Sequence, residues 1–384
     1  MADDMRYVYL DHNATTPVLP DVLEAMLPYQ REAFGNPSSL HHYGRRARVA
    51  VDDARDAVAE VVGAPASSVI FSSGGTEANN TIIKGVAQAR REHGRHLVTS
   101  QIEHPAVLDA CAALERQGYE VTYVPVGEHG LVNPQAVRDS LTDQTILVSI
   151  MAANNEVGTL QPIAEIAGLV RERGILMHTD AVQAFGKVPL SVDGLGVDFL
   201  SFSGHKIYAP KGIGGWYERS PAVLQPLLHG GHQERGRRSG TENVPGIAAL
   251  GTACAVAAGD MADEGERQRQ LQQRLEHGVR ERIGEVRIQG EEAPRLPGTT
   301  NVAFAGAEGE ALMMSLDLQG VAISTGSACS SGSLEPSHVL RAMRVPKPYL
   351  HGALRFSLGR ATTADDVDYV LDILPDIVAQ ARCV

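Results

Sequence analysis

Three polar motifs carry residue types that could act on a ligand, and each stands directly after an apolar run. The segment SSGGTEANN, residues 72–80, has two glycines and leads into a helical pattern, so free N–H groups at the start of that helix could hold an anion. Asp180, in HTDAVQ, supplies a carboxylate. Lys206, in SFSGHK, supplies an amine whose pKa would fall on burial, which makes it a candidate nucleophile.

Each motif alone also has an ordinary explanation. The glycines could form a simple strand-to-helix turn, Asp180 could be an exposed cap, and Lys206 could be a solvated loop lysine. The glycine segment lacks the Gly-Lys-Ser/Thr of a Walker A loop, so it does not indicate a nucleoside triphosphate site. The three motifs together do fit one cofactor. Pyridoxal phosphate needs a phosphate cradle, a carboxylate that keeps its ring nitrogen protonated and a lysine that bonds its aldehyde.

One of the four cysteines lies where a thiol could be chemically active. Cys329 belongs to STGSACSSGS, residues 324–333, which otherwise contains only Ser, Thr, Gly and Ala. Such a segment gives a thiolate reach at low steric cost, although a free thiol in a surface linker is the ordinary alternative. Cys111 and Cys254 lie in apolar helical patterns and are predicted to pack in the core, and Cys383 is next to the last residue. The spacing indicates neither a disulfide framework nor a zinc site.

The sequence between and around these motifs predicts alternating strands and helices, which would hold the motifs in place. Amphipathic patterns at residues 105–118 and 163–174 predict helices between short β-branched runs. This alternation is typical of an α/β fold with a mainly parallel sheet that is covered by helices on both faces, and ligands bind such sheets at the carboxyl ends of the strands. The predicted strands are residues 69–72, 96–100, 121–126, 146–151, 175–180 and 197–202.

The pattern changes after residue 259, which suggests a second domain. Residues 261–284 predict a long charged helix, most simply a solvated connector, and mixed helices and strands follow it. We therefore expect a large domain at residues 15–260. A smaller α+β domain would comprise residues 1–14 and 261–384 and carry the cysteine loop at about residues 324–334.

Length, net charge and the distribution of apolar residues limit the number of domains and the classes of partner. A chain of 384 residues exceeds a single core, which agrees with two domains. Its formal net charge of −12 argues against nucleic acid as a partner. The opening MADD is acidic where a targeting signal would be basic, and the apolar stretch at residues 247–258 is too short to cross a bilayer. We expect a cytoplasmic protein with no membrane partner.

Motifs along nearly the whole chain resemble those of the cysteine desulfurases of the NifS/IscS type, which belong to the class V aminotransferases and to the fold-type I pyridoxal phosphate enzymes. These motifs are YLDHNATTP, FGNPSSLH, FSSGGTEANN, EHPAV, ANNEVGTLQPI, HTDAVQ, SGHK, GGHQERGRRSGTEN, GSACSSGSLEPSHVLRAM and LRFSLGR. The cysteine loop discriminates best, because other class V enzymes lack it. The fold implied is a seven-stranded-type sheet sandwiched by helices, with a smaller α+β domain.

The resemblance implies a set of cofactor-binding residues. Lys206 would hold pyridoxal 5′-phosphate covalently, Asp180 would pair with its ring nitrogen, and Gln183 would hydrogen-bond its phenolic oxygen. Thr241 would reach the phosphate of a neighbouring subunit, so a homodimer is implied. The residues around the phosphate would be Gly75, Thr76, Ser203 and His205. The full set is Gly75, Thr76, His104, Asn155, Asp180, Gln183, Ser203, Gly204, His205, Lys206 and Thr241.

The same resemblance implies catalytic and substrate-binding residues. Lys206 and Cys329 would be catalytic, and His104 would stack on the cofactor ring and assist proton transfer. Without the resemblance, the EHP setting of His104 would suggest only a loop histidine. Arg355 would clamp the substrate carboxylate, for which a planar bidentate donor is suited, and Asn155 would lie beside it. No metal site is implied.

The implied reaction removes sulfur from L-cysteine. Lys206 would take the α-proton and Cys329 would attack the sulfur, which leaves L-alanine and a persulfide on Cys329. The sulfur would pass to an acceptor protein such as an iron–sulfur cluster scaffold. A selenocysteine lyase, or another class V enzyme such as an aminotransferase, would share the cofactor pocket, and a non-catalytic protein that retains the fold is a more distant alternative.

Overall fold

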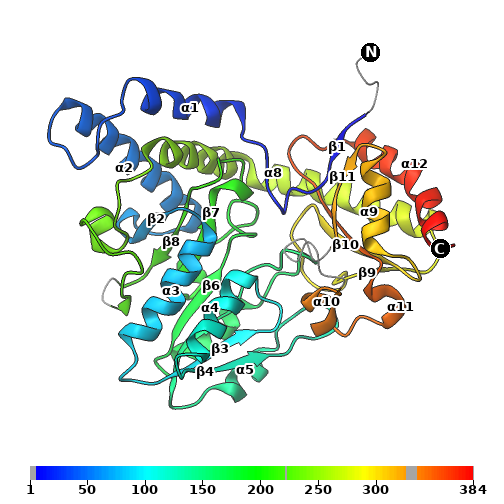
Figure 1. The fold of residues 1–384 in the computed structure, drawn as a ribbon, viewed down its shortest axis with the longest axis horizontal. Coiled ribbons are helices and arrows are strands. Elements are labelled where there is room, and N and C mark those ends of the chain that lie inside the picture. The colour runs from blue at the N-terminus through cyan, green and yellow to red at the C-terminus, as the bar shows by residue number, and fades with distance from the viewer. Residues whose placement is uncertain (1–5, 221–222, 326–334, 384) are drawn as a thin grey trace.

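The computed structural model describes residues 6–220, 223–325 and 335–383, and its largest element is a seven-stranded sheet (Figure 1). The strand order is β2-β8-β7-β6-β5-β3-β4, in which β8 runs antiparallel to both of its neighbours and the other pairs are parallel. The mainly parallel sheet predicted from the sequence is therefore confirmed. The strands are β2 (Val69–Ser72), β3 (His96–Ser100), β4 (Glu120–Val124), β5 (Thr145–Ser149), β6 (Leu176–Asp180), β7 (Phe199–Ser203) and β8 (Gly214–Glu218).

The strands were recognisable because most are buried on both faces. Every residue of β2, β3, β5 and β7 is buried, so these strands read as continuous apolar or β-branched runs. The sequence analysis missed β8, whose GGWYE begins with two glycines. At Gly215 a Cβ atom would lie 2.2 Å from the carbonyl oxygen of Ile70, so the close approach of β2 and β8 requires a residue without a side chain.

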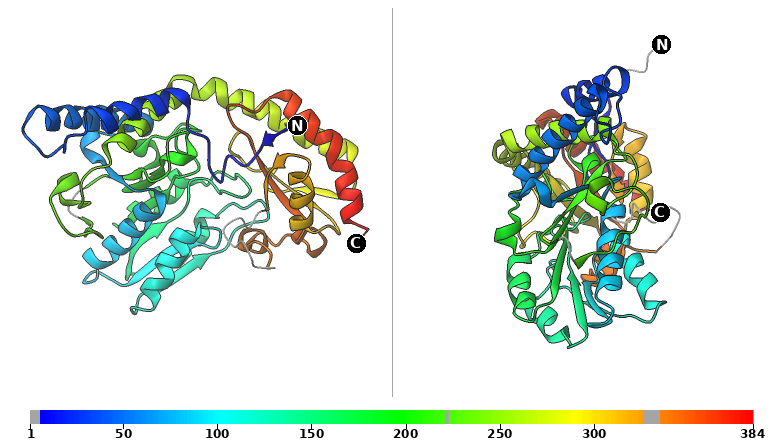
Figure 2. Two further views of the ribbon diagram at one scale, coloured as in Figure 1. Left: turned by 45° about the horizontal axis from the view of Figure 1, so that its top comes forward. Right: turned by 90° about the vertical axis from the view of Figure 1, so that its left-hand side faces the viewer.

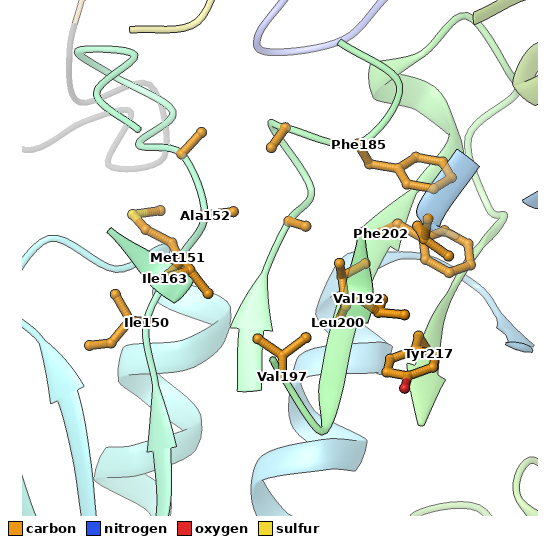
Figure 3. Close-up of a cluster of buried hydrophobic side chains, with 14 of the residues drawn as sticks. Ile150, Met151, Ala152, Ile163, Phe185, Val192, Val197, Leu200, Phe202 and Tyr217 are labelled. Carbon is orange, nitrogen blue, oxygen red and sulfur yellow. The ribbon is translucent and has the colours of Figure 1, made fainter. Parts of the chain in front are cut away.

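Helices cover both faces of this sheet. Side chains of α3 and α4 pack on one face around Trp216. The cluster on the opposite face includes side chains of α1, α2, α5, α6 and α7 and of the first part of α8 (Val244–Arg282). Figure 3 shows part of the hydrophobic cluster on this opposite face, where the rings of Phe185 and Phe202 stack with centroids 4.7 Å apart. The helices up to this point in the chain are α1 (Pro20–Arg31), α2 (His42–Val62), α3 (Gly75–Ala89), α4 (Pro105–Glu115), α5 (Pro134–Ser140), α6 (Ile163–Arg171) and α7 (Val192–Leu195).

A second sheet of four antiparallel strands has its own core. The strand order is β12-β13-β10-β9, and a separate parallel pair joins β1 (Val8–Tyr9) to β11 (Val321–Ala322). Leu10 near the N-terminus and Phe356 of β13 share one apolar cluster with α9 and α12. The elements here are β9 (Val286–Ile288), β10 (Thr299–Phe304), α9 (Gly309–Asp317), β12 (Ser324–Thr325), α10 (His338–Ala342), α11 (Lys347–Leu350), β13 (Ala353–Ser357) and α12 (Ala364–Ala381).

The helical segment α8 (Val244–Arg282), which is kinked at Asp260, joins the two regions (Figure 2). It contacts α1 and α2 near its start and α12 near its end. By length and composition α8 is the one helix in the described part of the chain that could cross a membrane, but half of its most apolar window is buried inside the protein, as in a core helix. The expectation of a solvated connector at residues 261–284 is wrong in part, because Leu271, Leu275 and Val279 pack into the second core. The domain boundary near residue 260 stays a prediction.

Candidate active site

A cavity opens at the carboxyl ends of the parallel strands, and most of the predicted site residues line it. Its volume is about 280 Å³, close to the lower end of the usual range for small-molecule sites. The lining residues come from the N-terminal segment, from the ends of β6 and β7, from the segments that follow β2, β3, β5, β6 and β7, and from β13. Those that the sequence analysis singled out are Gly75, Thr76, His104, Asn155, Asp180, Gln183, Ser203, His205, Lys206 and Arg355.

The start of α3 has the geometry of an anion cradle. Gly74, directly before the helix, has a φ of 151°, which other residues rarely adopt, and no side chain caps the helix. A Cβ atom on Gly75 would lie 2.5 Å from Cγ2 of Val182, so glycine is required there as well. The first N–H groups of a helix have no acceptor within it, and here Thr76 and Ser203 place hydroxyl groups beside them on the cavity wall.

Asp180 ends β6 as a buried carboxylate that faces the cavity. Its Oδ2 accepts a hydrogen bond from Nδ2 of Asn79 at 2.6 Å, and its Oδ1 accepts one from the backbone N–H of Val182 at 2.9 Å. The residue is 5% exposed. These two donors hold the carboxylate in place, so it can meet a cationic group of a ligand in the cavity.

Lys206 lies in the short 3-10 turn Gly204–Lys206 (η2) directly after β7. Its Nζ donates to the carbonyl oxygens of Asn13 at 2.6 Å and Ala14 at 2.7 Å, which places the N-terminal segment against the lysine. The neighbouring His205 contacts the hydroxyl of Thr15 through Nδ1 at 3.1 Å. Burial, and next the charge of Lys206, lower the pKa of His205 to about 4, so this ring is neutral at neutral pH.

His104 caps α4 with its own ring. Its Nδ1 accepts a hydrogen bond from the backbone N–H of Ala106 at 3.1 Å. Burial lowers the pKa of His104, and Lys206 lowers it further while Asp180 opposes the shift. A neutral ring that accepts at Nδ1 carries its proton on Nε2, so the cap fixes both the orientation and the tautomer of this cavity-lining histidine.

Arg355 of β13 reaches the cavity from the second sheet. Its Nη2 donates to Oδ1 of Asp11 at 2.7 Å and its Nη1 donates to the carbonyl oxygen of Asn155 at 3.0 Å. The side chain is 3% exposed, and its Nε has no partner in the described ranges. The guanidinium is thus anchored from both sides and still has donors for a further anion, since an arginine has five N–H groups.

Three predicted residues are not among those that line the cavity. Gly204 lies within the turn before Lys206, where its backbone N–H donates to the carbonyl oxygen of Ile213 at 3.0 Å. Thr241 is exposed and lies outside the cavity of its own chain. Cys329 lies outside the described residues. The buried Cys111 and Cys254 do pack in the core as predicted, and burial raises the pKa of both thiols.

Comparison with known proteins identifies the family. The family model described as aminotransferase class-V matches residues 8–370. The chain belongs to the class-V aminotransferase family. This class-V aminotransferase is 50% identical over 379 residues to a protein named cysteine desulfurase IscS from Dictyoglomus turgidum, a match that covers 99% of this chain and 96% of the relative.

Two solved structures superpose closely on this chain. One, a NifS-like protein, has a TM-score of 0.92 and 39% identity, and the match covers 98% of this chain and 100% of the other. Another, titled SspA in complex with cysteine, has a TM-score of 0.82 and 39% identity, with 91% and 98% covered. The predicted family and fold class are therefore confirmed.

The donors of the cavity fit pyridoxal phosphate, the cofactor of this family. The uncapped start of α3 suits a phosphate, and the carboxylate of Asp180 suits a protonated ring nitrogen. Two further polar atoms, Oδ1 of Asn79 and Nε of Arg355, are buried without a partner in the described part of the chain, and both residues line the cavity. A polar ligand would supply the partners that buried atoms require.

Two residues of the site were not predicted from the sequence. Asn13 lines the cavity and its carbonyl oxygen contacts Lys206, and Asn79 orients Asp180. The only signal was their place in YLDHNATTP and FSSGGTEANN, because a contact between residues so far apart leaves no periodic pattern.

Proposed function

We propose that this member of the class-V family is a pyridoxal phosphate-dependent cysteine desulfurase, which takes the sulfur of L-cysteine and leaves L-alanine and a persulfide on Cys329. The observation that carries the proposal is the cavity in which Lys206, Asp180 and Arg355 meet at the start of α3. The relative at 50% identity named cysteine desulfurase, and the similar structure titled as a complex with cysteine, support the choice of substrate.

The residues proposed to hold the cofactor follow from their places around the cavity. The N–H groups at the start of α3, with Thr76 and Ser203, would bind its phosphate. Asp180 would pair with its ring nitrogen, and Lys206 would bond its aldehyde. When bound, the cofactor supplies a ring that withdraws electrons from the substrate α-carbon.

The substrate would be held and deprotonated by residues of this chain. Arg355 would bind the α-carboxylate with donors that Asp11 and Asn155 leave free. The Nζ of Lys206 would accept the α-proton of the substrate. His104, neutral and with its proton on Nε2, would lie against the ring and assist proton transfer.

Cys329 would be the sulfur acceptor within the chain. Thr325 of β12 is the last described residue before the segment that contains Cys329. Its neighbour Ser324 pairs with Arg355 of β13. Cys329 follows Thr325 by four positions, and a fully extended chain spans at most about 3.5 Å per residue. The tether of the thiol therefore begins beside the residue that would bind the substrate carboxylate.

The functional unit would be a cytoplasmic homodimer. Thr241 is exposed outside the cavity of its own chain, as a residue that serves a neighbouring subunit would be. Large apolar side chains of α1, α2 and the loop between them are exposed and would pack in the dimer. The persulfide would be passed to an acceptor protein such as an iron–sulfur cluster scaffold, and the name IscS of the relative supports this choice.

The test is the mass of the intact protein after exposure to L-cysteine. We expect one added sulfur atom on the peptide that contains Cys329, with alanine formed in step, and neither in Cys329→Ala. Cys383→Ala, which removes an exposed thiol outside the site, is the matched control and should retain both. Alanine and sulfide at the wild-type rate from Cys329→Ala would overturn the proposal. A keto acid in place of a persulfide would instead identify an aminotransferase.

A further inference from the structure

A lysine that has no assigned role lies behind the cavity. The Nζ of Lys187 donates to Oε1 of Gln183 at 3.0 Å and to Oδ1 of Asn13 at 3.2 Å. Neither acceptor is charged, and no carboxylate within the described ranges forms an ion pair with this ammonium. Burial, and next the charges of Lys206 and Arg355, lower the pKa of Lys187 to about 7. The side chain is only partly exposed, and the charges of Lys206 and Arg355 act on it. A cation held near like charges without a carboxylate is unfavourable, so its position needs an explanation beyond packing.

The contacts of Lys187 determine how two amides are turned. In its protonated form Lys187 has only donors, and Gln183 and Asn13 then point their amide oxygens at it and their NH₂ groups away from it. Nδ2 of Asn13 accordingly donates to Oγ1 of Thr299 at 3.0 Å, and Nε2 of Gln183 donates to the carbonyl oxygen of Asn13 at 2.9 Å. Gln183 and Asn13 both line the cavity. Protonated Lys187 and the carbonyl oxygen of Asn13 together hold the amide of Gln183 so that it acts there as a donor.

We propose that Lys187 is a positioning residue, which holds the amide of Gln183 so that its NH₂ group meets an anionic ring oxygen of the bound cofactor. This inference rests on the proposed function, because it takes the phenolic oxygen of pyridoxal phosphate as the group that Gln183 meets. Without the ammonium, the amide is held only by the hydrogen bond from its Nε2 to the carbonyl oxygen of Asn13. A rotated amide would present its own oxygen, which would repel an anionic oxygen. A charge-assisted hydrogen bond then becomes an unfavourable contact.

The experiment measures binding of two ligands by full-length protein from which the cofactor has been removed. The ligands are pyridoxal 5′-phosphate and its 3-deoxy analogue, which lacks the phenolic oxygen. Lys187→Met keeps the length of the side chain and removes every donor. We expect it to weaken binding of pyridoxal 5′-phosphate by at least roughly tenfold and to change binding of the analogue by less than about twofold. Lys187→Arg should restore binding, and Lys347→Met, at an exposed lysine, should leave both affinities unchanged.

Each outcome decides the question. If Lys187→Met loses affinity equally for both ligands, or loses affinity for neither of them, the positioning role is overturned while the proposed function stands. If wild-type protein does not bind pyridoxal 5′-phosphate at all, the proposed function and this inference both fail. If Lys187→Met does not fold, as judged by circular dichroism, Lys187→Gln is measured in its place. The new amide carries no charge and can both donate and accept, so it does not force the oxygen of Gln183 to face it. The Lys187→Gln variant must then show the same selective loss for the inference to stand.

Discussion

At the scale of single residues, the site depends on side chains whose ionisation is set by burial. Glu103 directly precedes His104 and is fully buried. Its Oε1 accepts hydrogen bonds from Oγ of Ser100 at 2.5 Å and from the backbone N–H of Met151 at 3.0 Å, while its Oε2 has no partner among the described residues. Burial raises the pKa of Glu103 to about 8, so this carboxyl group is protonated at neutral pH.

Glu103→Gln should make the free energy of unfolding less dependent on pH. The carboxyl has a pKa of about 8 when folded and roughly 4.3 in the unfolded chain, so between these values the folded protein holds a proton that the unfolded chain has lost. The wild type therefore loses stability as pH rises through this window, by a few kcal/mol at most. The amide variant cannot lose that proton, so its stability relative to wild type should rise with pH.

Urea denaturation from about pH 5 to about pH 8 would check this prediction. Glu92→Gln, at an exposed carboxyl group, is the control and should parallel the wild type throughout. If the Glu103→Gln profile also parallels the wild type, then Glu103 is ionised in the folded protein and the prediction is wrong.

At the scale of elements, one buried ion pair joins α2, β2 and the 3-10 turn Gln233–Gly236 (η4). Nη1 and Nη2 of Arg55 each lie 2.7 Å from an oxygen of Glu234, and the two side chains are 7% and 2% exposed. Glu234 also accepts from the backbone N–H of Phe71 at 3.0 Å. The pair therefore fixes the turn that leads to Thr241 against the strand that leads to the anion cradle.

Arg55→Met should destabilise the protein by about 3–5 kcal/mol, because it leaves the carboxylate of Glu234 buried without its charge partner. The double variant Arg55→Met with Glu234→Met should recover part of this loss, since it buries no charge. Arg269→Met, which removes an exposed pair with Glu266, is the control and should cost about 0.5 kcal/mol or less. Urea denaturation of the variants measures all three, and a double variant no more stable than Arg55→Met alone would contradict the account.

At the scale of the whole molecule, the described chain exposes a group of large apolar side chains on one flank. They belong to α1, α2 and the loop between them, at the outer edge of Figure 1. Phe34 is 66% exposed and its ring stacks on Tyr43 with centroids 5.4 Å apart. A surface of this kind is typical of a protein interface. The group is Leu23, Phe34, Leu40, Tyr43 and Val49.

Phe34→Glu should weaken the proposed dimer by at least roughly tenfold, because a charge would be buried where an aromatic ring packs. Sedimentation velocity over a range of protein concentrations measures the change. Leu318→Glu, at a residue 74% exposed next to α9, is the matched control and should sediment as wild type does. A monomeric wild type, or a dimer indifferent to Phe34→Glu, would show that this flank is not the interface.

The sequence alone determined the elements whose signals are local. Buried parallel strands read as apolar runs, and the glycines before α3, the acid at the end of β6 and the lysine after β7 each follow such a run. Strands that run in parallel bring those endpoints to one edge, so a cofactor site could be predicted from the sequence. Arg355 could be singled out only through the family resemblance, because nothing in its own surroundings marks it.

Only the tertiary structure decided which distant segments complete the site. The carbonyl oxygens of Asn13 and Ala14 meet Lys206, and Asp11 meets Arg355, although about 190 and 340 positions of chain separate them. The structure also showed that an apolar stretch and a charged stretch follow one another in α8 with a kink at Asp260, and it showed β8 where glycines had hidden a strand. Periodicity reports which face of an element is buried. It does not report which other element covers that face, because that choice depends on packing summed over the whole chain.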